Sequence, residues 1–210
     1  MSILSQLSSQ VGDRSEASNR KVVRQCLENP ALLDEIAVGL KQQDAALLGD
    51  CAEVLTMVAE QHPDWVAPHA GIISTLLIHK NTRVRWEAMH ALALITTLAT
   101  GTIMALVPLL VQLIRQDKSV IVRDHAVDAL ANYASTGQQP AYCVYPYLKE
   151  TLTLWDGKQA AHALEGLVHV ARLLPDTRPE LRDIAVNFSA SERPVVRKAA
   201  KVLLNQLDSE

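Results

Sequence analysis

The feature that most constrains the fold of this chain is a Val-Arg pair that recurs in three similar segments. The pair stands at Val84-Arg85, Val122-Arg123 and Val196-Arg197. Alanine follows each Arg after three residues, and apolar residues follow it after six and seven. Because an α-helix has about 3.6 residues per turn, this spacing gathers the apolar side chains on one helical face. The chain is therefore predicted to repeat one helical unit.

Prolines mark a second register that is independent of the first. They follow one another at intervals of 38, 40, 38 and 33 residues. A proline is tolerated in the first turn of a helix, where its missing N–H has no partner, so each is expected to begin the second helix of a pair. The clearest unit spans 81–117, with Gly101 in its turn and Pro108 in the first turn of its second helix. The five prolines are Pro30, Pro68, Pro108, Pro146 and Pro179.

The stretches VRWEAMHAL, VRDHAVDAL and VRKAAKVLL, in units near 40 residues long, resemble HEAT repeats. The resemblance extends over about residues 16–207. It implies an all-α fold, a right-handed α–α superhelix of the HEAT/armadillo-like solenoid type, with about five helix pairs and a closing helix. First helices would lie on the convex side and second helices on the concave side. The closing helix either caps the array or belongs to a longer one.

One repeat domain is expected over 16–210. Residues 1–15 fit either a short amphipathic helix or a frayed tail, because Ile3, Leu4, Leu7 and Val11 fall at helical spacing among Ser and Gln.

Local signals predict helix starts and buried side chains. Asp44 is expected to cap the helix after it, Ser119 or Asp117 the helix near 120, and Asp156 the helix near 157. A buried stripe is expected after Pro30, made of Leu33, Ile36, Val38 and Leu40. The stacking positions of the repeat are expected to be buried as well: Ala88, Ala126, Ala160, Ala200, Leu92, Leu130 and Leu164.

Composition narrows the function classes. The chain is 49% hydrophobic and 20% charged, with a formal net charge of −3, so it has no basic field to attract nucleic acid. No apolar run reaches the roughly 20 residues that span a bilayer, and the N-terminus does not resemble a secretion signal, so a cytoplasmic location is expected. The three cysteines are expected to be reduced core thiols: Cys26, Cys51 and Cys143.

No pattern of catalytic or metal-ligating residues is present in the sequence. His162 and His169 are seven residues apart, about 10 Å along a helix at about 1.5 Å per residue, which is too far for chelation. Acidic residues such as Glu87 and Asp124 are expected to be solvated helix charges. Arg85, Arg123 and Arg197 are expected to make structural contacts, with acidic partners among Asp117, Asp124 and Asp128. No catalytic residue, metal or cofactor is predicted.

The predicted function is that of a non-catalytic scaffold that binds a protein partner on the concave face, since stacked helix pairs provide a long surface without a chemical site. Exposed second-helix positions are the first candidates: His69, Ser74, Gln112, Tyr147, Glu150 and Arg182. Aromatic side chains that favour interfaces are the others: Trp86, Tyr142, Tyr145 and Trp155.

Two alternatives remain open. One is a HEAT-like enzyme of the DNA-alkylation glycosylase or tetrapyrrole lyase type. The other is a structural subunit that associates with itself or with an assembly through its last helix, by way of Val196, Leu203 and Leu204.

Overall fold

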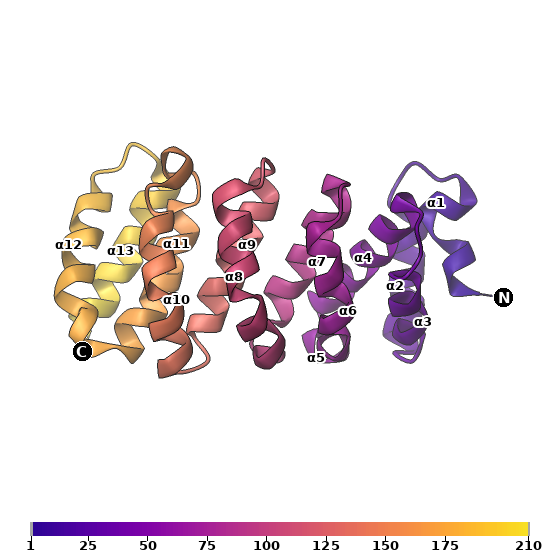
Figure 1. Ribbon diagram of the computed structural model, residues 1–210, viewed down its shortest axis with the longest axis horizontal. Coiled ribbons are helices and arrows are strands. Elements are labelled where there is room, and N and C mark those ends of the chain that lie inside the picture. The colour runs from indigo at the N-terminus through magenta and orange to yellow at the C-terminus, as the bar shows by residue number, and fades with distance from the viewer. Residues whose placement is uncertain (1, 210) are drawn as a thin grey trace. The chain divides into compact units, whose positions relative to one another are not determined.

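A computed structural model describes residues 2–209 of the chain. These residues form helices and connecting turns, and none of them lies in a β-strand (Figure 1). The chain divides into two compact units, 1–102 and 103–210. Each unit is described by itself.

The first unit places α2, α4 and α7 in one row, with the intervening helices packed against that row. α4 contacts both α2 and α7, while α3 packs on α4, and α6 and η3 pack on α7. Ile3 and Leu7 of the N-terminal segment are buried in this core. The elements are η1 (Ile3–Gln6), α1 (Ser8–Val11), α2 (Ala17–Glu28), α3 (Leu32–Gly39), α4 (Ala45–Ala59), α5 (Pro63–Val66), η2 (Ala67–His69), α6 (Ala70–Ser74), η3 (Thr75–Ile78) and α7 (Thr82–Ile95).

The second unit repeats this arrangement. α9, α11 and α13 form one row, α10 packs on α9 and α11, and α12 packs on α11 and α13. Helix α8, which begins at the end of the first unit, leads into this row. The elements are α8 (Thr100–Gln116), α9 (Val120–Ala134), α10 (Gln138–Thr151), η4 (Leu154–Gly157), α11 (Ala160–Leu173), η5 (Pro175–Thr177), α12 (Arg178–Ser189) and α13 (Pro194–Asp208).

The stacking positions predicted from the repeat are confirmed. The four alanines and three leucines are all buried, and so are the valines of the Val-Arg pairs, Val84, Val122 and Val196. Two predicted caps are also confirmed, because Asp44 Oδ1 accepts from the Ala46 N–H at 2.9 Å and Ser119 Oγ accepts from the Val122 N–H at 3.4 Å.

Gly166 allows α11 to approach α9 closely. A Cβ atom built at this position would lie 2.8 Å from Ala131 Cβ and 3.1 Å from the Ala131 Cα on α9. The obstacle is partly backbone, so it cannot move aside as a flexible side chain would.

We expect Gly166→Ala to destabilise the protein by about 1 to 2 kcal/mol, because overpacking outweighs the roughly 1 kcal/mol that alanine gains over glycine inside a helix. Urea denaturation measures the change. Gly71→Ala is the matched control, since nothing lies within 4 Å of a Cβ at that helical glycine. A Gly166→Ala protein at least as stable as the wild type would contradict the close contact.

The prediction that each of the five regularly spaced prolines begins a helix is wrong at Pro108, Pro146 and Pro68. Pro108 and Pro146 lie inside α8 and α10, which begin earlier, at Thr100 and Gln138. The residues before each proline bury apolar side chains, Ile103 and Val107 in the first case, and this burial outweighs the lost backbone hydrogen bond.

The segment at Pro68 forms no single helix. It is broken into the short elements α5, η2, α6 and η3, and the first of these begins at Pro63.

Three further expectations are corrected. Val38 is 52% exposed, because it points away from the core side of α3 on which Leu33 and Ile36 lie. Asp156 does not cap α11; it has a left-handed backbone with φ 56°, and Gln159 is the residue before the helix. Cys143 is exposed, since α10 turns residues 141, 144 and 148 toward the core instead.

Candidate protein-interaction surface

Helices α8 and α10 of the second unit are joined by a bidentate ion pair. Arg115 Nε donates to Glu150 Oε1 at 2.8 Å, and Arg115 Nη2 donates to Glu150 Oε2 at 2.6 Å. The guanidinium holds the pKa of the Glu150 carboxyl below its ordinary value. Tyr147 lies beside this pair and shares a shallow hollow with it. Parallel hydrogen bonds of this kind fix the orientation of both side chains.

Helices α10 and α12 are joined in a similar way through Glu180. Lys149 Nζ donates to Glu180 Oε1 at 2.6 Å, and the Tyr145 hydroxyl donates to Glu180 Oε2. The Lys149 ammonium also lies 4.7 Å from the centroid of the Tyr145 ring. Lys149 and Tyr145 lower the pKa of Glu180, while burial and the Glu180 carboxylate raise the pKa of Tyr145.

These side chains form one surface across three successive second helices. Tyr142 projects from α10 and is 70% exposed. The surface has both signs of charge and three tyrosines, and its paired side chains are already ordered. We call it the second-helix surface and define it as Gln112, Arg115, Tyr142, Tyr145, Tyr147, Lys149, Glu150 and Glu180.

The remaining predicted residues lie elsewhere. Arg182 turns to the end of α13, where Nη1 lies 2.7 Å from Asp208 Oδ1 and Nη2 donates to the Leu207 carbonyl. The ring of Trp155 lies over the guanidinium of Arg123, with its centroid 4.0 Å from Arg123 Cζ. The indole N–H of Trp155 donates to the Ile114 carbonyl.

The other three belong to the first unit. His69 Nε2 lies 3.7 Å from Asp34 Oδ1, and Ser74 donates to the Gly71 carbonyl. Trp86 donates its indole N–H to Glu87 Oε1 at 2.8 Å.

Sequence reasoning missed Arg115, Lys149 and Glu180. A signal for them was present, because Arg115 and Glu150 are 35 residues apart, and so are Tyr145 and Glu180. In a repeat of this length, such a separation places two residues at neighbouring positions of successive second helices.

No protein-family model matches the chain, and no curated protein matches its sequence. Solved structures do match. A designed armadillo repeat protein in complex with the peptide (KR)4 is 18% identical, with a TM-score of 0.75 over 98% of both chains. A HEAT-like repeat protein from Thermococcus onnurineus NA1 is 14% identical, with a TM-score of 0.58 over 92% of this chain and 93% of that one. An engineered protein is 20% identical, with a TM-score of 0.72 over 100% of both chains.

The chain has the HEAT/armadillo-like α-solenoid fold. At these identities the likeness establishes the fold alone, so function has to be argued from the residues of this chain.

The arginines of this HEAT/armadillo-like chain have a structural role. Arg85 donates to the His79 carbonyl, Arg123 to the Asp117 carbonyl and Arg197 to the Ser191 carbonyl, always six residues upstream. Each guanidinium therefore ties its own helix to the turn that precedes it.

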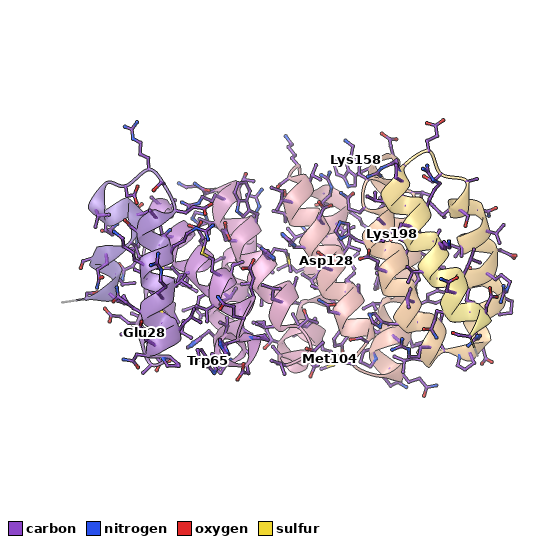
Figure 2. All side chains as sticks on the ribbon, turned by 180° about the vertical axis from the view of Figure 1, so that it is seen from behind. Glu28, Trp65, Met104, Asp128, Lys158 and Lys198 are labelled. Carbon is purple, nitrogen blue, oxygen red and sulfur yellow. The ribbon has the colours of Figure 1, made fainter. Side chains whose placement is uncertain are left out.

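The acidic residues singled out in the sequence have two different environments. Asp128 (labelled in Figure 2) joins α9 to α11, since Oδ1 lies 2.6 Å from His162 Nδ1 and Oδ2 lies 3.4 Å from His125 Nδ1. Glu87 is half-buried rather than solvated, and burial raises the pKa of its carboxyl. No group of three or more His, Cys, Asp or Glu in the described residues is arranged to hold a metal ion.

The Asp128–His162 contact predicts a pH-dependent contribution to stability. Burial raises the pKa of Asp128, but hydrogen bonds from His125 and His162 outweigh it and lower the pKa from 3.8 to about 2. The Asp128 carboxylate in turn raises the pKa of His162 above 6.5. The stability that comes from the lowered pKa of Asp128 is present above pH 3.8 and is lost as the pH falls to about 2. The stability that comes from the raised pKa of His162 is complete below pH 6.5 and is lost as the pH rises through that raised pKa.

We expect Asp128→Asn to cost about 1 kcal/mol more at about pH 5.5 than at about pH 9, because the charged pair exists only at the lower pH. Urea denaturation of both proteins at the two pH values measures the difference. Asp124 and Glu165, which also act on His162, and the half-buried His169 are common to both proteins. An equal cost at the two pH values would show that the histidine is not charged by Asp128.

The contact predicted for the last helix needs correction. Val196 and Leu203 are buried within the second unit, because α13 packs on α11 and α12, and Leu204 is half-buried. The exposed apolar side chains of α13 are Val195 and Val202 instead.

Within residues 2–209, no helix has the length and apolar character that a bilayer span requires.

Proposed function

We propose that this HEAT/armadillo-like protein is a non-catalytic scaffold that binds an extended segment of a protein partner on the second-helix surface. The observation that carries the proposal is the Arg115–Glu150 and Lys149–Glu180 pairing across α8, α10 and α12. Side chains already ordered by these pairs lose less conformational entropy when a partner binds.

The composition of the surface suits polar recognition of a peptide. Tyr142 and Tyr147 supply broad rings with hydroxyl groups, which bury area at low entropic cost. Gln112 is exposed on α8 and has both a donor and an acceptor for a peptide backbone. The designed armadillo protein with peptide (KR)4 offers an analogy for a peptide on this type of fold.

Selection of a displayed peptide library against the whole chain tests the proposal. Selected peptides are then synthesised and titrated by calorimetry into the wild type and into Tyr147→Ala. We expect Tyr147→Ala to weaken binding about tenfold or more, as for an aromatic residue at the centre of an interface. Lys201→Ala on α13 is the matched control, since Lys201 is exposed in the same unit but outside the second-helix surface.

Two results would contradict the proposal. One is a set of selected peptides that bind the wild type and the Tyr147→Ala, Tyr142→Ala double variant equally well. The other is tight, salt-sensitive binding of duplex DNA at low salt, which would favour a nucleic-acid enzyme of similar fold.

A further inference from the structure

The first unit contains a cavity of about 440 Å³ that the second-helix surface does not use. It lies between residues 8–16, α4 and α7. Its charged lining consists of five carboxylates and two guanidinium groups: Asp13, Glu16, Asp50, Glu53 and Glu87 against Arg14 and Arg83. Because Glu16 is paired with Arg20 outside the lining, two negative charges are in excess. The cavity is large enough for one long side chain.

The floor of the cavity is a fixed network around one arginine. Arg83 Nη2 donates to Asp50 Oδ1 at 2.9 Å and to Glu53 Oε2 at 2.8 Å. Both carboxylates are buried and accept further bonds from the Asn19 amide, at 3.1 and 2.6 Å. A single guanidinium is thus shared between two carboxylates, and one negative charge of the floor stays uncompensated.

Glu87 adds a third carboxylate near Arg83, on the wall of the cavity. Its Oε1 accepts from the indole of Trp86, which is a neutral donor, and no ion pair joins it to a Lys or Arg among residues 2–209. Burial and the neighbouring Glu53 carboxylate disfavour its charge, and they outweigh the favourable effects of the Trp86 hydrogen bond and of Arg83, so the pKa of Glu87 is raised. A half-buried carboxylate in this setting is stabilised by any cation that enters the cavity.

Trp86 supplies an apolar wall beside these carboxylates. A planar cation can contact an indole ring with its face while its N–H groups donate to carboxylates at its edge. The side chains needed for both contacts therefore meet in one cavity.

We propose that this cavity binds a guanidinium group, as an arginine side chain of a partner presents it. The guanidinium contacts the ring of Trp86 and donates hydrogen bonds to Glu87, in the space above Glu53. The same residues are less suited to a metal ion, because no three His, Cys, Asp or Glu side chains of the described residues meet at metal-binding distances.

The test uses the full chain, labelled with ¹⁵N, and N-acetyl-arginine methylamide as the probe. The Trp86 indole N–H reports on the site directly, because it is the donor to Glu87. We expect a saturable shift of this signal with a dissociation constant on the order of 1 mM, as for a ligand of this size. The indole signals of Trp65 and Trp155 serve as internal controls, and Trp86→Phe assigns the peak.

Two matched comparisons decide the chemistry. The citrulline analogue has the same shape without the charge, and we expect it to bind at least fivefold more weakly. Glu87→Gln keeps the size of the side chain and is expected to weaken binding of the arginine probe at least fivefold. Glu192→Gln is the matched control, because Glu192 is exposed in the second unit and lies outside both the cavity and the second-helix surface, and it should leave binding of the probe unchanged. Circular dichroism and the Trp155 signal confirm that the variants are folded.

Several outcomes would overturn the proposal. They are the absence of a Trp86 shift with the arginine probe, equal binding of the citrulline analogue, and unchanged binding to Glu87→Gln. Equal binding of the N-acetyl-lysine analogue would also overturn it, because an ammonium cannot make the planar contacts that distinguish a guanidinium.

Discussion

Leu130→Ala is expected to lower the free energy of unfolding by about 2 to 5 kcal/mol. Leu130 is completely buried on α9, the helix on which α10 and α11 both pack. Truncation removes three carbon atoms from a position where two neighbouring helices prevent collapse, so the lost transfer free energy and the cavity both contribute. Urea denaturation followed by circular dichroism measures the change.

Val186→Ala is the matched control for this prediction. It removes apolar carbon from α12 of the same unit, but Val186 is 56% exposed, so its effect should stay within about 0.5 kcal/mol. A loss well under 1 kcal/mol for Leu130→Ala would show that the leucine does not fill the space between helices.

Trp155→Ala is expected to cost about 2 kcal/mol, the sum of a cation–π contact and a hydrogen bond to the backbone. The indole covers the guanidinium of Arg123, which is 1% exposed and whose Nε atom has no hydrogen-bond partner. It also donates at 2.8 Å to the Ile114 carbonyl, one of the last carbonyls of α8. Removing Trp155 therefore deprives a buried cation of its aromatic cover and a helix end of its donor.

Trp155→Phe separates the two contributions. The phenyl ring retains an aromatic face for Arg123 but loses the indole N–H and the smaller ring, so we expect a cost of about 1 to 2 kcal/mol. Both variants are compared with the wild type by urea denaturation at constant pH. If Phe and Ala cost the same, the ring contact with Arg123 contributes nothing measurable.

The part of the fold that sequence predicted well depends on short-range periodicity. The alanines and leucines after each Val-Arg pair repeat at helical spacing, and burial at Ala126 and Leu130 follows from that spacing alone. Proline was a weaker guide, because its preference for a first turn is only statistical. At Pro108 and Pro146 the burial of the preceding apolar residues extends the helix across the proline.

The candidate sites were harder to predict because they depend on contacts between distant residues. The sequence predicts Tyr147 and Glu150 as exposed second-helix positions. Arg115 and Glu180, which orient this surface, lie beside them because α8, α10 and α12 pack side by side. Glu87 is predicted to be solvated, but it is half-buried because α4 packs against α7, and no local pattern encodes this contact.

The left-handed backbone at Trp155 and Asp156 has a consequence for the order of folding. Non-glycine residues with φ of 52° and 56° are disfavoured by roughly 1 kcal/mol or more each, so this turn has no local tendency to form. It is held by Ile114 and Arg123, more than 30 residues upstream in the chain. We therefore expect the turn to close late, after α8 and α9 have packed, so that Trp155→Phe speeds unfolding more than it slows folding.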